Sequence, residues 1–300
     1  MKRRTFLSTL ATACAVSTLP GTLLADGTKK KLLYFDRSTS FVHPSTKIQE
    51  DGLSFGSRVL KKLAEKLGYE LVCTKDGRVF DGDLEAYDAF LFNCCGQLTG
   101  EKGEPGSFPM SKEGEQKFFA AIRAGKGLLG FHSASDTNHS GGPAFENKPE
   151  AERSEYIRIL GGEFIVHGSQ QAVTLRFPNP KDLPSLAALG ESWDAPVEEW
   201  YALKNFNPDI HVLIVQDTEG MKIEGGNKCY NRPPYPCTWV RKEGQGTVAF
   251  TTFAHNQAMW EADWVQAILL DLMKVITGKL ECDFTPNLNQ AAPGGTTLQN

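Results

Sequence analysis

The first half of the chain alternates short apolar runs with amphipathic stretches. Four runs have the length and composition of buried strands, at 31–35, 69–73, 88–92 and 127–131. Two stretches between them carry apolar residues at helical spacing. One runs from Leu53 to Leu67 and is ended by Gly68, and the other runs from the N-capping residue Ser111 to Ala124. Strands and helices in strict alternation predict a parallel sheet with helices on both faces.

The pattern changes in the second half. A short helix is expected at 155–160, and it is followed by strands with few helices between them, at 171–177, 211–216, 238–241 and 247–253. An apolar stripe from Trp264 to Val275 marks a closing helix that ends at Gly278. These strands predict an antiparallel extension of the same sheet. We therefore expect a three-layer α/β fold of the flavodoxin-like type, mainly parallel, in one domain over 31–280.

Both ends of the chain are expected to lie outside this domain. Lys2-Arg3-Arg4-Thr5-Phe6-Leu7 is a twin-arginine pattern, and a moderately apolar stretch rich in Ser, Thr and Ala follows it. Residues 1–25 are therefore predicted to be a twin-arginine signal peptide that exports a bacterial protein to the periplasm. The stretch is too polar for a membrane span. Residues 283–300 are rich in Asn, Gln, Gly and Pro and are predicted to form a flexible tail.

The composition limits the kinds of ligand and cofactor that the protein is expected to bind. A net charge of −4 over 300 residues gives no basic surface for nucleic acid, so the expected ligand is a small molecule. The glycine-rich patches do not form Gly-x-Gly-x-x-Gly after a strand, which argues against a nicotinamide cofactor. Six of the seven cysteines follow the predicted signal, and Cys229 and Cys237, which bracket a proline-rich loop, are the first candidates for a disulfide. A homo-oligomer is compatible with these features.

The most informative segment is Gly130-Phe131-His132-Ser133, which comes directly off the apolar strand at 127–131. Groups just past the carboxyl end of a central strand face the ligand crevice of an open α/β sheet. The turn has no cysteine, so a thiolate acyl-enzyme is excluded there. It also lacks Gly-x-Ser-x-Gly, so Ser133 is not expected to be a nucleophile. His132 is the strongest catalytic candidate.

Three further histidines, His43, His167 and His255, stand at the ends of expected strands. Any one alone is more often a structural histidine than a ligand. Four at strand ends predict one shared site. Glu199, flanked by Trp200 and Tyr201, is the acidic candidate, because burial against aromatic rings would raise its pKa toward use as a general base.

The predicted site residues fall into two groups. The catalytic candidates are His132, His167, Glu199 and His255. The substrate-binding candidates are His43, Asn93, Gln97, Ser133, Asp136 and Tyr201. Asp136 has two readings, since it could orient His132 or cap the next helix. The catalytic group could also hold a divalent metal such as zinc, although no short His-x-His or His-Glu-x-x-His spacing supports this.

Taken in order, five motifs resemble the ThuA-like (trehalose utilisation) family, a branch of the class I glutamine amidotransferase-like fold: Phe41-Val42-His43-Pro44, Gly130-Phe131-His132-Ser133, Phe164-Ile165-Val166-His167, Glu198-Glu199-Trp200-Tyr201 and Phe253-Ala254-His255-Asn256. The likeness covers roughly 31–278. The chain departs from the family where His-Pro becomes His167-Gly168 and Gly-His becomes Ala254-His255. Because the elbow cysteine is missing, the chain is not expected to be a glutamine amidotransferase.

The resemblance implies carbohydrate utilisation. Members of the family are tied to trehalose and related disaccharides and act on 3-keto sugars that a partner sugar dehydrogenase produces. It implies Glu199 or His132 as the base, and His167 and His255 as enolate stabilisers, directly or through a metal. Hydrolase and lyase chemistry both stay open. Two alternatives are a non-catalytic sugar-binding or accessory protein on an amidotransferase-like scaffold, and a metal-dependent hydrolase of another small substrate.

Overall fold

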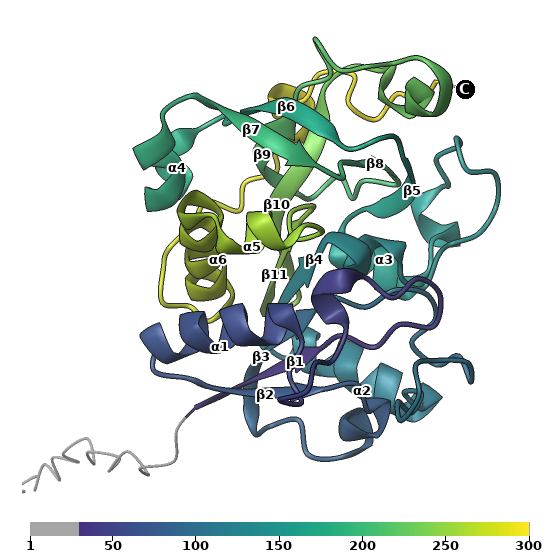
Figure 1. Cartoon of the computed structure of the whole chain (residues 1–300), viewed down its shortest axis with the longest axis vertical. Helices are drawn as coiled ribbons and strands as arrows, with labels where there is room; N and C mark the ends of the chain where they lie inside the picture. The colour runs from purple at the N-terminus through teal and green to yellow at the C-terminus, as the bar shows by residue number, and fades with distance from the viewer. Residues whose placement is uncertain (1–29, 300) are drawn as a thin grey trace, which may run out of the picture.

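A computed structural model describes residues 30–299, and the predicted signal peptide lies outside them. Its central feature is a nine-stranded sheet with the strand order β2-β1-β3-β4-β11-β10-β9-β6-β7 (Figure 1). The first five of these strands pair in parallel. They are β1 (Lys31–Phe35), β2 (Glu70–Thr74), β3 (Tyr87–Phe92), β4 (Gly127–Phe131) and β11 (Gly246–Thr251).

The second half of the chain continues the sheet with antiparallel pairs. The strands are β10 (Tyr235–Glu243), β9 (His211–Gln216), β6 (Gln171–Arg176) and β7 (Ser192–Glu198). A separate antiparallel pair is formed by β5 (Glu163–His167) and β8 (Tyr201–Lys204). The predicted fold class, a mainly parallel sheet with an antiparallel extension, is confirmed.

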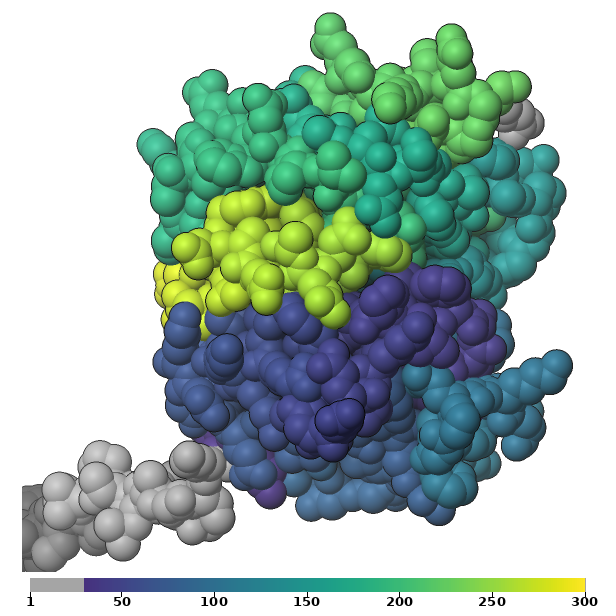
Figure 2. Space-filling model, in the orientation of Figure 1, coloured from purple at the N-terminus to yellow at the C-terminus, as the bar shows by residue number. Residues whose placement is uncertain are grey.

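Helices cover both faces of the sheet because its strands are apolar on both sides. Along β1, Leu32 and Tyr34 belong to one apolar core, and Leu33 and Phe35 belong to the other. The first core packs against α1 (Phe55–Lys66), α4 (Pro184–Leu189), α5 (Gln257–Glu261) and α6 (Asp263–Ile276). The second packs against α2 (Lys112–Arg123), α3 (Glu155–Leu160) and α7 (Leu288–Ala291). Helices α1 and α5, distant in sequence, lie side by side (Figure 2).

The two long helices of the first half begin where serine caps them. Ser54 Oγ accepts a hydrogen bond from the backbone amide of Ser57, and Ser111 Oγ accepts one from the amide of Gly114. Such caps stabilise a helix by about 1 kcal/mol each. After α1, Gly68 adopts a φ of 79°, which a residue with a Cβ adopts only under strain. These caps and stops explain why the helix boundaries were predictable.

Several features of the second half differ from the prediction, among them β7, β8, α4 and the state of the cysteines. The edge strand β7 was not expected, and Pro196 lies within it; an edge strand tolerates proline since one side of it makes no ladder bonds. The predicted disulfide is wrong, since all six cysteines of residues 30–299 are unpaired. Cys237 is fully buried within β10, with its Sγ 3.5 Å from Ile214 O, while Cys229 lies in a separate turn.

Residues 283–299, expected to form a flexible tail, make contacts with the body of the domain in the structure. Asn287 Oδ1 accepts a hydrogen bond from Val212 N, and Asn287 N donates to Ile210 O. The side chains of Leu288 and Ala292 are buried. Polar and turn-forming residues here satisfy exposed backbone groups of β9, which composition alone does not reveal. Every helix within residues 30–299 falls short of the length or hydrophobicity that crossing a bilayer requires.

Candidate active site

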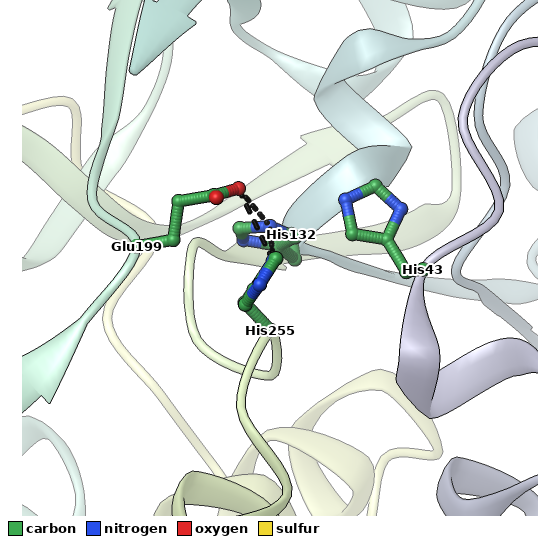
Figure 3. A group of neighbouring side chains, drawn as sticks. All are labelled: His43, His132, Glu199 and His255. Atoms are coloured by element: carbon green, nitrogen blue, oxygen red, sulfur yellow. Dashed lines mark hydrogen bonds and ion pairs between the residues drawn. The ribbon is translucent and has the colours of Figure 1, made fainter. Parts of the chain in front are cut away.

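Four predicted side chains meet at one edge of the sheet (Figure 3). His43, His132 and His255 follow β1, β4 and β11, whose carboxyl ends share an edge because these strands are parallel. Glu199 lies between β7 and β8 and reaches the same place from the antiparallel extension. Each residue offers one ligand atom, and these atoms all lie within 4.8 Å of one another. We call these four residues the His/Glu cluster.

The contacts within the cluster centre on the Glu199 carboxylate. Its Oε1 lies 3.1 Å from His255 Nδ1 and 3.4 Å from His132 Nε2. The same two nitrogens are 3.3 Å apart. The His43 ring stands edge-on to both imidazoles, with centroids 5.0 Å from His132 and 5.4 Å from His255. All four residues are buried, so their interactions are weakly screened by water.

Two strained backbone positions aim these imidazoles. His132 has a φ of 40° and Ala254, just before His255, has a φ of 95°, a region that favours glycine. The His132 carbonyl is held by Ser135 Oγ at 2.9 Å, and the Ala254 carbonyl is held by Trp260 Nε1 at 2.8 Å. Ala254 therefore adopts a conformation that favours glycine, and it stands at the position where the resemblance to the ThuA-like family leads us to expect glycine before the histidine. Strain kept at two such turns indicates that the ring positions matter more than local stability.

The protonation of the imidazoles follows from their partners. His132 Nδ1 lies 2.9 Å from Thr252 O, which can only accept, so Nδ1 carries the proton and Nε2 presents a lone pair to the cluster. Burial lowers the pKa of His132. Burial, together with the neighbouring imidazoles of His132 and His255, lowers the pKa of His43 to about 2. Both rings are therefore neutral at physiological pH, the form that binds metals.

The acidic residues behave differently from the prediction. Burial alone would raise the pKa of Glu199, but its contacts with the imidazoles of His132 and His255 lower it well below its ordinary value. The expected raised pKa is therefore wrong for Glu199. It belongs to Glu198, whose pKa burial raises to about 7. Glu198 accepts hydrogen bonds from the amides of Glu199 and Asn256, and so fixes the backbone beside both Glu199 and His255. The adjacent pair Glu198-Glu199 in the sequence pointed to Glu198 as well, but its raised pKa depends on burial, which the sequence does not show.

The cluster has the donor set of a zinc-type site. Three imidazoles and one carboxylate converge, and His43 and His132 are held neutral. His43 Nε2 lies 3.2 Å from Tyr201 Oη, while His43 Nδ1 is one of the buried polar atoms in residues 30–299 without a hydrogen-bond partner. A bound ion would satisfy such an atom. The Tyr201 hydroxyl would then orient the ring, as outer partners of metal-bound histidines do.

His167 is not part of this cluster. The ligand set expected from the sequence contained His167, and the cluster in the structure has His43 in its place. The side chain of His167 is 42% exposed, and its Nδ1 lies 2.9 Å from Gly168 O and 3.5 Å from Glu199 Oε2. With Nδ1 donating to that carbonyl, Nε2 is left with a lone pair. His167 thus stands at the solvent side of Glu199, where a base can meet a substrate.

Of the remaining predicted residues, some lie beside the His/Glu cluster and the rest lie away from it. The Tyr201 ring lies 3.9 Å from that of His132, and Tyr201 contacts the cluster directly. Asn93 Oδ1 accepts a hydrogen bond from Ser133 Oγ, and this buried pair lies behind the His132 turn. Gln97 is exposed and uses its backbone amide to bind Thr39 Oγ1. Asp136 neither orients His132 nor caps a helix.

Asp136 belongs instead to an ion triad with His139 and Glu163, which the sequence reading missed. His139 Nε2 lies 2.6 Å from Asp136 Oδ1, and His139 Nδ1 lies 2.9 Å from Glu163 Oε1. Hydrogen bonds to Asp136 and then to Glu163 raise the pKa of His139 to about 9. The triad ties the turn that carries His132 to the first residue of β5.

We expect this triad to make stability depend on pH in the alkaline range. The folded-state pKa of His139 is raised from 6.5 to about 9, so its contribution is complete below pH 6.5 and is lost as pH rises through about 9. The melting temperature of His139→Gln should fall below that of the wild type by a few degrees at pH 6. The difference should vanish near pH 10. A constant difference across this range would contradict the role of the imidazolium charge.

The fold and the cluster together define a flavodoxin-like α/β protein with imidazoles and a carboxylate at the carboxyl edge of its parallel strands. The sequence profile of the ThuA family, described as trehalose utilisation, matches residues 41–274, and the chain belongs to this family.

Solved structures of similar fold agree with this membership. A ThuA-like protein from Bacteroides uniformis ATCC 8492 has a TM-score of 0.59 at 19% identity, covering 86% of this chain and 94% of its own. Another, from Parabacteroides merdae ATCC 43184, has a TM-score of 0.57 at 17% identity, covering 90% of this chain and 96% of its own. At these identities the likeness concerns the fold alone. No curated protein matches the chain.

Proposed function

We propose that this protein is an exported enzyme of carbohydrate utilisation that cleaves 3-keto-disaccharides or related 3-keto-glycosides. The observation that carries the proposal is the buried cluster of three imidazoles and one acidic carboxylate at the carboxyl edge of the sheet. A donor set of this kind suits a divalent metal, which would stabilise the negative charge that develops on the oxygen of a ketone substrate. Membership of the trehalose utilisation family supports a sugar as the substrate.

The chemistry follows from the ketone. A carbonyl at C3 acidifies the proton on C2, so a base removes that proton and the electron pair forms an enolate across C2 and C3. The enolate then expels the substituent at C1: the C1–O bond breaks, and the leaving oxygen takes up a proton. This completes a lyase reaction, and addition of water across the resulting double bond completes a hydrolysis. The site must therefore supply a base, an acid and a group that stabilises the enolate oxygen.

The contacts assign these roles to particular side chains. Glu199 is a poor base because its contacts with the imidazoles of His132 and His255 lower its pKa. His167 is a better base, since it is exposed and its Nε2 carries a lone pair. A divalent metal such as zinc, held by the His/Glu cluster, would supply a Lewis acid for the C3 oxygen. Tyr201, bonded to His43, keeps that ring in place and excludes water beside it.

The decisive experiment is an assay of the purified chain with a 3-keto-disaccharide and with the unoxidised disaccharide. We expect turnover of the oxidised sugar alone, because only the ketone acidifies C2. In deuterated water, exchange of the C2 proton should accompany turnover. Sugar binding without turnover would instead favour a non-catalytic binding protein. Cleavage of the unoxidised sugar would favour a metal-dependent hydrolase of another substrate.

The cellular setting is part of the proposal. A 3-keto substrate requires a sugar dehydrogenase upstream, so the two enzymes should work in the same compartment. The twin-arginine pattern at residues 2–7 supports the periplasm as that compartment. Fractionation of cells that express the full chain tests this, with Arg3 and Arg4 replaced by lysine as the matched control. The wild type should be found in the periplasm, and the variant should stay in the cytoplasm.

A further inference from the structure

An exposed phenylalanine stands beside the buried cluster. Phe41 is 59% exposed, and its ring lies edge-on to His43 with the centroids 4.8 Å apart. Single exposed apolar side chains are common and need no explanation by themselves. The position of Phe41 does need one, because its neighbour His43 is a buried member of the His/Glu cluster.

The loop that carries Phe41 is held in place by hydrogen bonds of the two residues before it, Thr39 and Ser40. Thr39 N donates to Cys95 O at 2.8 Å, and Thr39 Oγ1 accepts from Gln97 N at 2.7 Å. Ser40 Oγ lies 3.0 Å from Cys95 Sγ. These contacts fix the loop to the segment that follows β3, just before Phe41. The ring is therefore positioned by its neighbours and left with an open face toward solvent.

Phe41 also ends a series of rings that line the cluster. From His43 the series continues to His132 and then to Tyr201, whose ring lies 3.9 Å from that of His132. Phe164 follows, 4.1 Å from Tyr201. Figure 2 shows the N-terminal part of the chain, in purple, meeting yellow and teal parts on one face. His43, His132 and Tyr201 are buried, so Phe41 is the most exposed ring of this series. An aromatic face beside polar groups is a surface that suits a pyranose ring, since its C–H faces are apolar and its rim carries hydroxyls.

We propose that Phe41 determines specificity by stacking on the second sugar ring of the substrate, the one that leaves. The inference rests on the proposed function, in which the oxidised ring reaches the His/Glu cluster. Phe41 lies on the exposed side of His43, so the part of the substrate beyond the oxidised ring extends over it. The site then selects disaccharides, or other glycosides with a ring as leaving group, over simple alkyl glycosides.

The test compares two substrates, a 3-keto-disaccharide and methyl 3-keto-glucoside, which lacks the second ring. Phe41→Ala should raise KM for the disaccharide about tenfold, equivalent to about 1.4 kcal/mol, and leave its kcat within about twofold. KM for the methyl glycoside should not change. Phe41→Tyr, which keeps an aromatic face, should restore the disaccharide KM. Phe108→Ala, at a phenylalanine that is 43% exposed and contacts Arg78, is the matched control and should behave as the wild type.

Each other outcome overturns the inference in a recognisable way. If the wild type turns over both substrates and Phe41→Ala leaves both KM values unchanged, the stacking role is wrong and the proposed function stands. If Phe41→Ala lowers kcat for both substrates alike, Phe41 acts on His43 and not on the second ring. If the wild type turns over neither substrate, the proposed function and the role of Phe41 both fall.

Discussion

Replacing His132 with asparagine is expected to lower kcat for a 3-keto-disaccharide by about a thousandfold. His132 contacts Glu199 and His255, and its Nε2 lone pair faces the cluster, so its loss removes one of the donors that would hold a Lewis-acidic metal for the enolate oxygen. Asparagine is the replacement of choice because His132 has a φ of 40°, which asparagine tolerates better than most residues. Steady-state kinetics would measure the loss.

A matched control is available at another buried histidine. His211 lies at the start of β9, where Nε2 is 2.9 Å from Asp182 Oδ2 and Nδ1 is 2.7 Å from Thr285 O. His211→Asn should lower the melting temperature without a comparable loss of kcat. Equal kcat losses in the two variants would show that the His132 effect is one of folding. Unchanged turnover in His132→Asn would remove His132 from the chemistry.

The second large effect concerns metal binding. We expect the purified chain to carry about one zinc ion, and we expect His43→Ala to retain less than about a tenth of it, because that variant removes one of four converging donors. Glu199→Gln should lose the ion as well. His167→Ala should keep it, since His167 lies outside the cluster. Elemental analysis of the three variants gives the comparison directly.

A second readout guards against misfolded variants. An ion that binds only the folded chain stabilises it by about 2.7 kcal/mol at a hundred times its Kd. After a chelator has removed the bound metal, added zinc should therefore raise the melting temperature of the wild type and of His167→Ala. It should leave that of His43→Ala unchanged. A wild type without metal and without this shift would reject the metal site. Loss of the ion in His167→Ala but not in His43→Ala would restore the ligand set expected from sequence.

The fold was largely predictable because its signals are local. Buried parallel strands appear as continuous apolar runs, and serine caps and glycine stops mark α1 and α2 within a few residues. The edge strand β7 and the packing of residues 283–299 were not predicted. In β7, Trp193, Ala195 and Val197 do alternate with other residues, but Pro196 lies among them, so the strand depends on its pairing with β6. Residues 283–299 depend on partners far away in the sequence, as when Asn287 binds β9.

The site was predictable in part for the same geometric reason. Histidines that follow β1, β4 and β11 had to meet, since parallel strands end at one edge. The choice between His43 and His167 was not predictable, because it depends on how the β5–β8 pair packs over that edge. The pKa of Glu199 depends in the same way on the imidazoles of His132 and His255, which come from elsewhere in the chain.

The position of β11 in the sheet affects when the chain can fold during its synthesis. This strand lies between β4 and β10, so residues 246–251 bridge the parallel and antiparallel halves. During synthesis, the strand that joins the two halves into one sheet is absent until some 250 residues have left the ribosome. The imidazole at position 255 emerges only moments afterwards. Folding and the acquisition of reactivity should therefore be a single late event, and shortened translation products that end before it should be inert.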